Sequence, residues 1–273
     1  MSELDYNKIG LKCGLEIHQQ LDTKKLFCNC PSVLRKDEPD FNVRRKLHAV
    51  AGESGEIDVA AKYQVSLDKE FVYEGYDTTC LVELDEEPPR EINEEALEVA
   101  LQVSKLLNCD IVDEIEIMRK TVVDGSNVSG FQRTSLIAVD GHMSTSLGKI
   151  HIPTISIEEE AAQKLEGGKD FVKYKLDRLG IPLIEIATDA SIKNNEHAKE
   201  VAAQIGMILR SVQGIKRGLG TIRQDVNVSI NKGARTEIKG FQDLRSIPKV
   251  VDYEIHRQLK LIKQDKKLRE RIL

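Results

Sequence analysis

The segment KCGLEIHQQ, from Lys12 to Gln20, alternates apolar and polar side chains as a half-buried strand requires. Its apolar residues would line one face, and Glu16 and His18 would share the other. The segment TIRQDVNVSI, from Thr221 to Ile230, repeats the pattern more clearly, although Gln224 interrupts its apolar row. Its polar face would carry Arg223, Asp225, Asn227 and Ser229. The two segments predict a sheet whose functional groups gather on one side.

Five further stretches have the composition of strands and are separated by glycine-rich and polar turns. They are Glu56–Val65, Glu114–Lys120, Gln132–Val139, Lys149–Ile157 and Ile181–Thr188. Helical periodicity occurs in only three places: Asn93–Leu107, the segment between Asn194 and Gly214, and the segment from Ser246 through Ile262. Because parallel strands need long crossovers that are usually helical, most of the sheet should be antiparallel.

The chain has no internal repeat, low-complexity segment or linker that would mark a domain boundary. We therefore expect residues 1–273 to form a single α+β domain, in which helices cover a mainly antiparallel sheet. The last stretch, Lys260–Leu273, is charged and has lost its apolar stripe, so we interpret this end as a truncation.

Composition excludes several classes of protein. With 273 residues and 40% hydrophobic content, the chain can bury a sizeable core. A formal charge of −5, no Trp and 4% aromatic residues argue against nucleic-acid binding by overall attraction or by base stacking. No run of about 18 apolar residues and no signal sequence is present, so we expect a cytoplasmic protein with no membrane segment.

Several predicted strands place a carboxylate among apolar residues, which is costly unless that group is paired, protonated or bound to a cation. The candidates are Glu16 with His18, the run Glu158–Glu160, Glu185, Asp225 and Glu237. Oxygen ligands with one imidazole suit Mg²⁺ or Mn²⁺, and Mg²⁺ usually carries nucleotide phosphates. Taken singly, each carboxylate fits a structural ion pair better, and His18 alone fits a structural histidine better; only the joint pattern favours a metal site.

Basic residues occur close to the same segments and could neutralise the charge of a phosphoryl group in transfer. They are Arg119, Lys120, Arg178, Arg223 and Lys239. Neither GxxxxGK[ST] nor GxGxxG occurs, so a P-loop or Rossmann nucleotide site is excluded.

The five cysteines are too few and too irregular for a secreted disulfide framework. Cys28 and Cys30 form a CxC motif, and Cys80 follows about fifty residues later. Zinc sites usually take four ligands from paired motifs, and the second pair is missing here. A group of reduced thiols is therefore favoured over a zinc site, and both stay open.

Seven blocks of sequence, in this order and spacing, resemble the signature blocks of the GatB/GatE family. They are GLEIH (Gly14–His18), RKTVVDGSNVSGFQR (Arg119–Arg133), IEEEA (Ile157–Ala161), LDRLGIPLIEI (Leu176–Ile186), TIRQDVNVS (Thr221–Ser229), TEIK (Thr236–Lys239) and YEIHRQ (Tyr253–Gln258). The resemblance covers nearly the whole chain. It implies a curved antiparallel sheet that forms a cradle, similar to glutamine synthetase and the guanido kinases.

The resemblance also implies an activity: Mg²⁺ and ATP activate the glutamate side chain of Glu-tRNA(Gln) by phosphorylation, and ammonia then converts it to Gln-tRNA(Gln). The implied metal ligands are Glu16, His18, Glu159 or its neighbour Glu158, Glu185, Asp225 and Glu237. Family chains continue with insertion, helical and tail domains that hold tRNA, so this chain would bind tRNA poorly.

The segment VVDGSNVSGFQRT, from Val122 to Thr134, resembles the archaeal E branch, whereas the bacterial B branch has a tyrosine-rich block ending in YPD. The E branch implies an asparaginase-like D subunit as the ammonia source and a homodimer within a heterotetramer. A bacterial-type B subunit and a non-catalytic tRNA-binding scaffold of the same fold are the alternatives.

Overall fold

The structure is a computed structural model that describes the chain except residues 1–3, 47, 49–50, 52–54 and 273. Within this part, an eight-stranded sheet has the order β12-β11-β1-β10-β7-β6-β4, and β5 pairs with β6. The strands are β1 (Lys12–Gln20), β4 (Asp110–Ile111), β5 (Met118–Thr121), β6 (Phe131–Thr145), β7 (Gly148–Glu159), β10 (Pro182–Ala187), β11 (Ile222–Ser229) and β12 (Thr236–Phe241). All their pairings are antiparallel, as the sequence predicts.

Strand β1 lies at the middle of this sheet, between β10 and β11. Cys13, Leu15 and Ile17 are buried in the hydrophobic core, whereas Glu16 and His18 lie on the opposite face and are half-buried. The predicted alternation of this strand is therefore confirmed, and so are the predicted strands that became β6, β7, β10 and β11.

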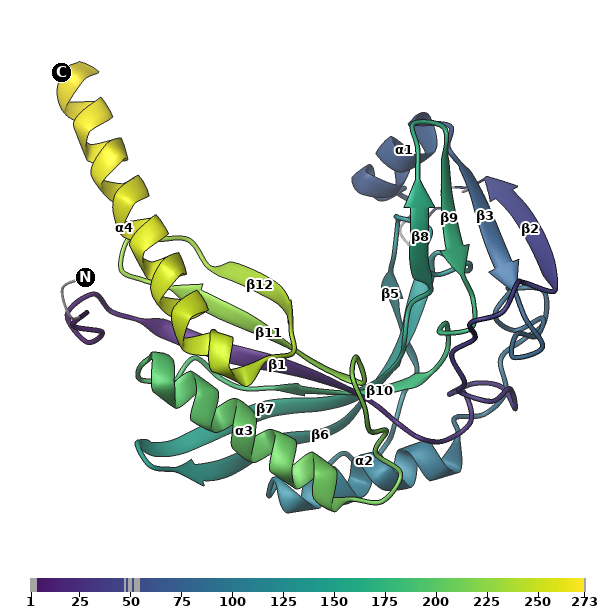
Figure 1. The fold of residues 1–273 in the computed structure, drawn as a ribbon, viewed down its shortest axis with the longest axis horizontal. Helices are drawn as coiled ribbons and strands as arrows, with labels where there is room; N and C mark the ends of the chain where they lie inside the picture. Colours follow the sequence, from purple (N-terminus) through teal and green to yellow (C-terminus); the bar gives the residue numbers. More distant parts are fainter. Residues whose placement is uncertain (1–3, 47, 49–50, 52–54, 273) are drawn as a thin grey trace.

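Three helices cover the apolar face of the sheet (Figure 1): α2 (Glu94–Leu106), α3 (Asn195–Ser211) and α4 (Ile247–Ile272). These are the three predicted helices. Asn93 and Asn194 cap α2 and α3 by accepting hydrogen bonds from the backbone N–H groups of Ala96 and His197. Because all three helices pack on one side, no helix of the described part of the chain covers the face with Glu16 and His18.

A second, four-stranded sheet rises beside one end of the main sheet (Figure 1). Its order is β2-β3-β9-β8, formed by β2 (Phe41–Lys46), β3 (Glu70–Gly75), β9 (Phe171–Lys175) and β8 (Gln163–Gly167). The β3–β9 pair is parallel, and the other pairs are antiparallel. A separate cluster of buried side chains, which includes Phe71, Tyr73 and Tyr174, supports this sheet.

The predicted strand at Glu56–Val65 is wrong, because the segment forms helix α1 (Val59–Ser66). Asp58 caps this helix by accepting a hydrogen bond from the N–H of Ala61, and none of its residues is buried. The cap stabilises this helix locally. Because none of its side chains is buried, the sequence has no apolar stripe that would predict a helix here. The predicted strand at Glu114–Lys120 is confirmed only at its end, as β5.

The α+β class and the covering helices are confirmed; the likeness to glutamine synthetase and the guanido kinases stays a prediction. Among the described helices, none combines the length with the apolar composition that a membrane span requires.

Two glycines give a matched test of the packing around β1. A Cβ at Gly14 would lie 2.8 Å from the backbone oxygen of Asp189, whereas a Cβ at Gly206, within α3, would meet nothing within 4 Å. Gly14→Ala should destabilise the fold by about 1–3 kcal/mol through this overlap. Gly206→Ala should stabilise it by about 1 kcal/mol, because Ala is the better helix former. Urea unfolding would check both, and an unchanged midpoint for Gly14→Ala would show that the strand shifts freely.

Candidate active site

His18, Glu158 and Glu185 meet on the uncovered face of the main sheet. The pairing of β1 with β10 sets His18 opposite Glu185, and β7 brings Glu158 opposite Leu183. The imidazole Nε2 of His18 lies 3.6 Å from Glu185 and 4.0 Å from Glu158. One ligating atom from each of the three lies within 4.8 Å of the others, so the trio can surround a single cation.

The carboxylates of this first trio repel each other. Burial raises the pKa of Glu158, and the charge of Glu185 raises it further. His18 lowers the pKa of Glu185 despite burial. The ammonium group of Lys120 lies 2.9 Å from Glu158 and 3.9 Å from Glu185, and although burial lowers its pKa, these carboxylates raise it overall. Lys120 therefore supplies positive charge to the trio.

Glu16, Asp225 and Glu237 form a second trio on the same face, again with ligating atoms within 4.8 Å. Glu16 lies opposite Asp225 in the β1–β11 pair. A register shift between β11 and β12 accompanies Asp225, which accepts a hydrogen bond of 2.7 Å from the N–H of Gly240. Such a bulge re-aims a side chain, and here it places Asp225 beside Glu237.

The second trio also carries an excess of negative charge. Burial raises the pKa of Glu16, and Glu237 adds to the effect. Lys239 lies 3.4 Å from Asp225 and 3.0 Å from Glu237, but its side chain is 70% exposed. Because water screens the charge of an exposed lysine, Lys239 offsets only part of this negative charge.

The two trios are neighbours, since Glu16 and His18 lie two residues apart on β1, roughly 7 Å along a strand. Together they hold five carboxylates. In the described part of the chain, the lysines paired with these carboxylates are Lys120 and Lys239. The Nδ1 atom of His18 is buried and has no hydrogen-bond partner among the described residues. Carboxylate oxygens with one imidazole are the ligands that Mg²⁺ and Mn²⁺ accept, so this donor set fits such ions.

The strand alternation separates Glu159 from this site, although it was a candidate ligand. Its side chain is buried on the opposite face of β7 from Glu158 and lies 3.1 Å from the guanidinium of Arg133. Burial raises the pKa of Glu159, and Arg133 opposes the shift. Of the two alternatives that the resemblance left open, Glu158 is the one that lies with His18 and Glu185.

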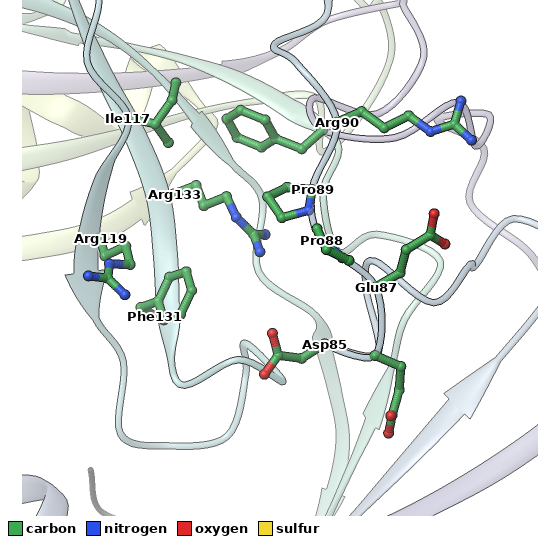
Figure 2. A pocket seen from close by; sticks show the side chains of 11 residues that line it. Asp85, Glu87, Pro88, Pro89, Arg90, Ile117, Arg119, Phe131 and Arg133 are labelled. Carbon is green, nitrogen blue, oxygen red and sulfur yellow. The ribbon is translucent and has the colours of Figure 1, made fainter. Parts of the chain in front are cut away.

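Arg119 also faces away from the two trios. With Arg133 it lines a pocket of about 530 Å³, where both guanidinium groups lie against the ring of Phe131 (Figure 2). The loop Asp85–Arg90 forms the other wall (Figure 2). This pocket contains none of the candidate metal ligands, so the pocket and the acidic face are distinct features.

Arg178 and Arg223 meet at Glu160, a residue to which sequence reasoning assigned no separate role. Arg223 lies opposite His18 in the sheet and donates a hydrogen bond of 2.7 Å to Glu160. The Nε atom of Arg178 lies 3.7 Å from the same carboxylate oxygen. The two arginines therefore stand beside the first trio.

Cys28, Cys30 and Cys80 gather with Glu83, and their ligating atoms lie within 4.8 Å of one another. A pattern of cysteine spacing does not include Glu83, which stands three residues after Cys80. The thiol of Cys28 hydrogen bonds to Glu83, and its contact with Cys30 lowers the pKa of Cys30 to about 7. The structure thus supplies a fourth donor, a carboxylate, at the position where a zinc site lacked one.

The fold is of the α+β class, and its open sheet face holds two adjacent acidic trios whose donor atoms fit hard cations. The model of the GatB/GatE catalytic domain matches residues 11–271, and the chain belongs to this family. It is similar to the E subunit of glutamyl-tRNA(Gln) amidotransferase from Archaeoglobus fulgidus, with 54% identity over 98% of this chain and 44% of the relative. The corresponding protein of Methanocaldococcus jannaschii is 56% identical over 98% of this chain and 43% of the relative.

The chain therefore spans less than half the length of the curated relatives that it matches. Both relatives are E subunits by name, in agreement with the branch that Val122–Thr134 predicted.

The buried pair of Arg133 and Glu159 predicts a stability that depends on pH. Arg133→Ala leaves a buried carboxylate without its cation and should cost about 3 kcal/mol. The pKa of folded Glu159 should then rise further above its unfolded value, so stability falls as pH increases between those two values. Urea unfolding at pH 5 and pH 8 would show a larger loss at pH 8; an equal loss at both would contradict this account.

Proposed function

We propose that this chain carries the ATP-dependent active site of a glutamyl-tRNA(Gln) amidotransferase, a ligase that converts Glu-tRNA(Gln) to Gln-tRNA(Gln). The observation that carries the proposal is the pair of acidic trios side by side on one sheet face, with four basic residues around them. Membership of the GatB/GatE family and the names of the relatives support it.

The reaction proceeds in two steps. An oxygen of the glutamate side-chain carboxylate attacks the terminal phosphorus of ATP, and ADP leaves. Ammonia then attacks the carbonyl carbon of the acyl phosphate, phosphate departs with its oxygen, and the nitrogen loses a proton to leave the amide. Activation is needed because a carboxylate is a poor electrophile and its oxygen a poor leaving group.

The residues have distinct roles in this proposal. His18, Glu158 and Glu185 hold one divalent cation, and Glu16, Asp225 and Glu237 hold a second. Magnesium, when bound, neutralises charge on the nucleotide phosphates. Lys120, Lys239, Arg178 and Arg223 add positive charge along the same face. A rigid sheet suits this work, because phosphoryl transfer depends on positioning more than on covalent chemistry.

The ammonia source is proposed to be an asparaginase-like D subunit, and the assembly a homodimer within a heterotetramer in the cytoplasm. A non-catalytic scaffold that binds tRNA is the competing function. The cost of holding so many carboxylates together argues against it, because a scaffold gains nothing from that arrangement.

Nucleotide binding separates these two functions. Isothermal titration with a non-hydrolysable ATP analogue should show binding that requires Mg²⁺ and weakens at least tenfold in Asp225→Ala, since a lost ligand costs more than about 1.4 kcal/mol. Glu254→Gln changes a buried carboxylate on α4, which packs on the opposite, apolar face of the sheet, and this variant should bind like the wild type. Absence of binding by the wild type with or without Mg²⁺ would favour the scaffold. Formation of Gln-tRNA(Gln) from Glu-tRNA(Gln), ATP and ammonium chloride would test the whole reaction.

The two trios also predict two separable cation sites. Titration with Mn²⁺, followed by electron paramagnetic resonance, should count two bound ions per wild-type chain. Glu185→Gln should remove one and Glu237→Gln the other, because each change takes a carboxylate from one trio only. Loss of both ions in either variant would mean that the trios form one site.

A further inference from the structure

Glu160 is a buried carboxylate that binds no metal ion in the proposed mechanism. Its side chain is 2% exposed, and its two oxygens have different partners. One oxygen accepts a hydrogen bond of 2.6 Å from the amide of Gln20, and the other accepts one of 2.7 Å from Arg223. Gln20 lies at the end of β1, on the same face as His18 by strand alternation.

The two arginines at Glu160 are held firmly but stay accessible. Arg178 donates hydrogen bonds to the backbone oxygens of Ala161 and Ala162, and Arg223 is anchored by Glu160. Their side chains are 30% and 32% exposed. A guanidinium group has about five N–H donors, and within the described residues Arg223 uses one. Donors therefore remain on both groups for a ligand on the open face.

The guanidinium groups of Arg178 and Arg223 approach the same oxygen of Glu160, and without this carboxylate they would repel each other. The group formed by Glu160, Arg178 and Arg223 has a net charge of +1, beside a trio of opposite sign. An anion that also coordinates cations in that trio, such as the phosphate chain of a nucleotide, matches both neighbours.

We propose that Glu160 is a positioning residue that holds Arg178 and Arg223 toward the phosphate chain of the nucleotide. The inference rests on the proposed function, in which that nucleotide is ATP. Gln20 assists by fixing the second oxygen of Glu160, which keeps the carboxylate from rotating away from the arginines.

Glu254 provides a matched control. It is a buried carboxylate that also accepts hydrogen bonds from one arginine and one glutamine, Arg257 and Gln258, at 2.7 Å each. Arg257 and Gln258 lie three and four residues along the same helix, whereas Gln20 and Arg223 reach Glu160 from β1 and β11. Glu254→Gln and Glu160→Gln therefore remove similar interactions in different places.

The test measures the affinity of this chain for Mg²⁺ with a non-hydrolysable ATP analogue, and for Mg²⁺ with tripolyphosphate, which lacks the nucleoside. Glu160→Gln should weaken both by about tenfold, which corresponds to one charge-assisted contact. Glu160→Asp keeps the charge and should restore most of the affinity, while Glu254→Gln should leave both affinities unchanged. Circular dichroism would confirm that each variant is folded.

The outcomes separate the inference from the proposed function. If the wild type binds tripolyphosphate but not the nucleotide, ATP is the wrong ligand, and Glu160→Gln still tests the positioning role. Weakened binding of the nucleotide with unchanged binding of tripolyphosphate would overturn the role of Glu160, as would an equal loss in Glu254→Gln. If Glu160→Gln does not fold, Gln20→Leu replaces it in the test. This variant should bind tripolyphosphate about threefold more weakly than the wild type, and an unchanged affinity would overturn the inference.

Discussion

Mutual repulsion among the carboxylates of the open face is opposed by the burial of apolar side chains on the other face of the same strands. On β1, Glu16 and His18 alternate with Leu15 and Ile17, which are anchored in the core under three helices. Because polar and apolar side chains alternate on one backbone, a strand cannot move its polar residues apart without pulling its apolar residues out of the core. The energy that holds the acidic groups together therefore comes from the packing of α2, α3 and α4, elements that contribute none of the candidate ligands.

Sequence reasoning succeeded where one periodicity dominated. The alternation in β1 and β11 and the capped amphipathic helices α2 and α3 gave both the elements and the face on which Glu16, His18 and Asp225 lie. It failed where structure depends on distant partners. Strand β8 has no buried residue, and β3 pairs in parallel with the distant β9, with Glu70 opposite Phe171, so local sequence does not reveal either pairing. Helix α1 begins at the capping residue Asp58 and buries none of its side chains, so its composition alone resembles that of a strand.

Within the run Glu158–Glu160, composition alone could not assign roles to three identical residues. The structure separates them by direction: Glu158 joins His18, Glu159 meets Arg133 on the opposite face, and Glu160 holds Arg223. Only the register of β7 against its neighbours decides which carboxylate points where. The same chemistry therefore serves a candidate cation site, a structural ion pair and the positioning of an arginine.

The register of β1 against two strands at once limits how this chain can change over evolutionary time. Side chains along a strand alternate with a period of two, so the deletion or insertion of a single residue exchanges its faces. In β1 such a change would turn Leu15 and Ile17 toward the open side and press Glu16 and His18 into the core. Lineages of this domain can thus change the length of the loops around β1 far more easily than the number of residues within the strand, because a change inside it exchanges its two faces at once.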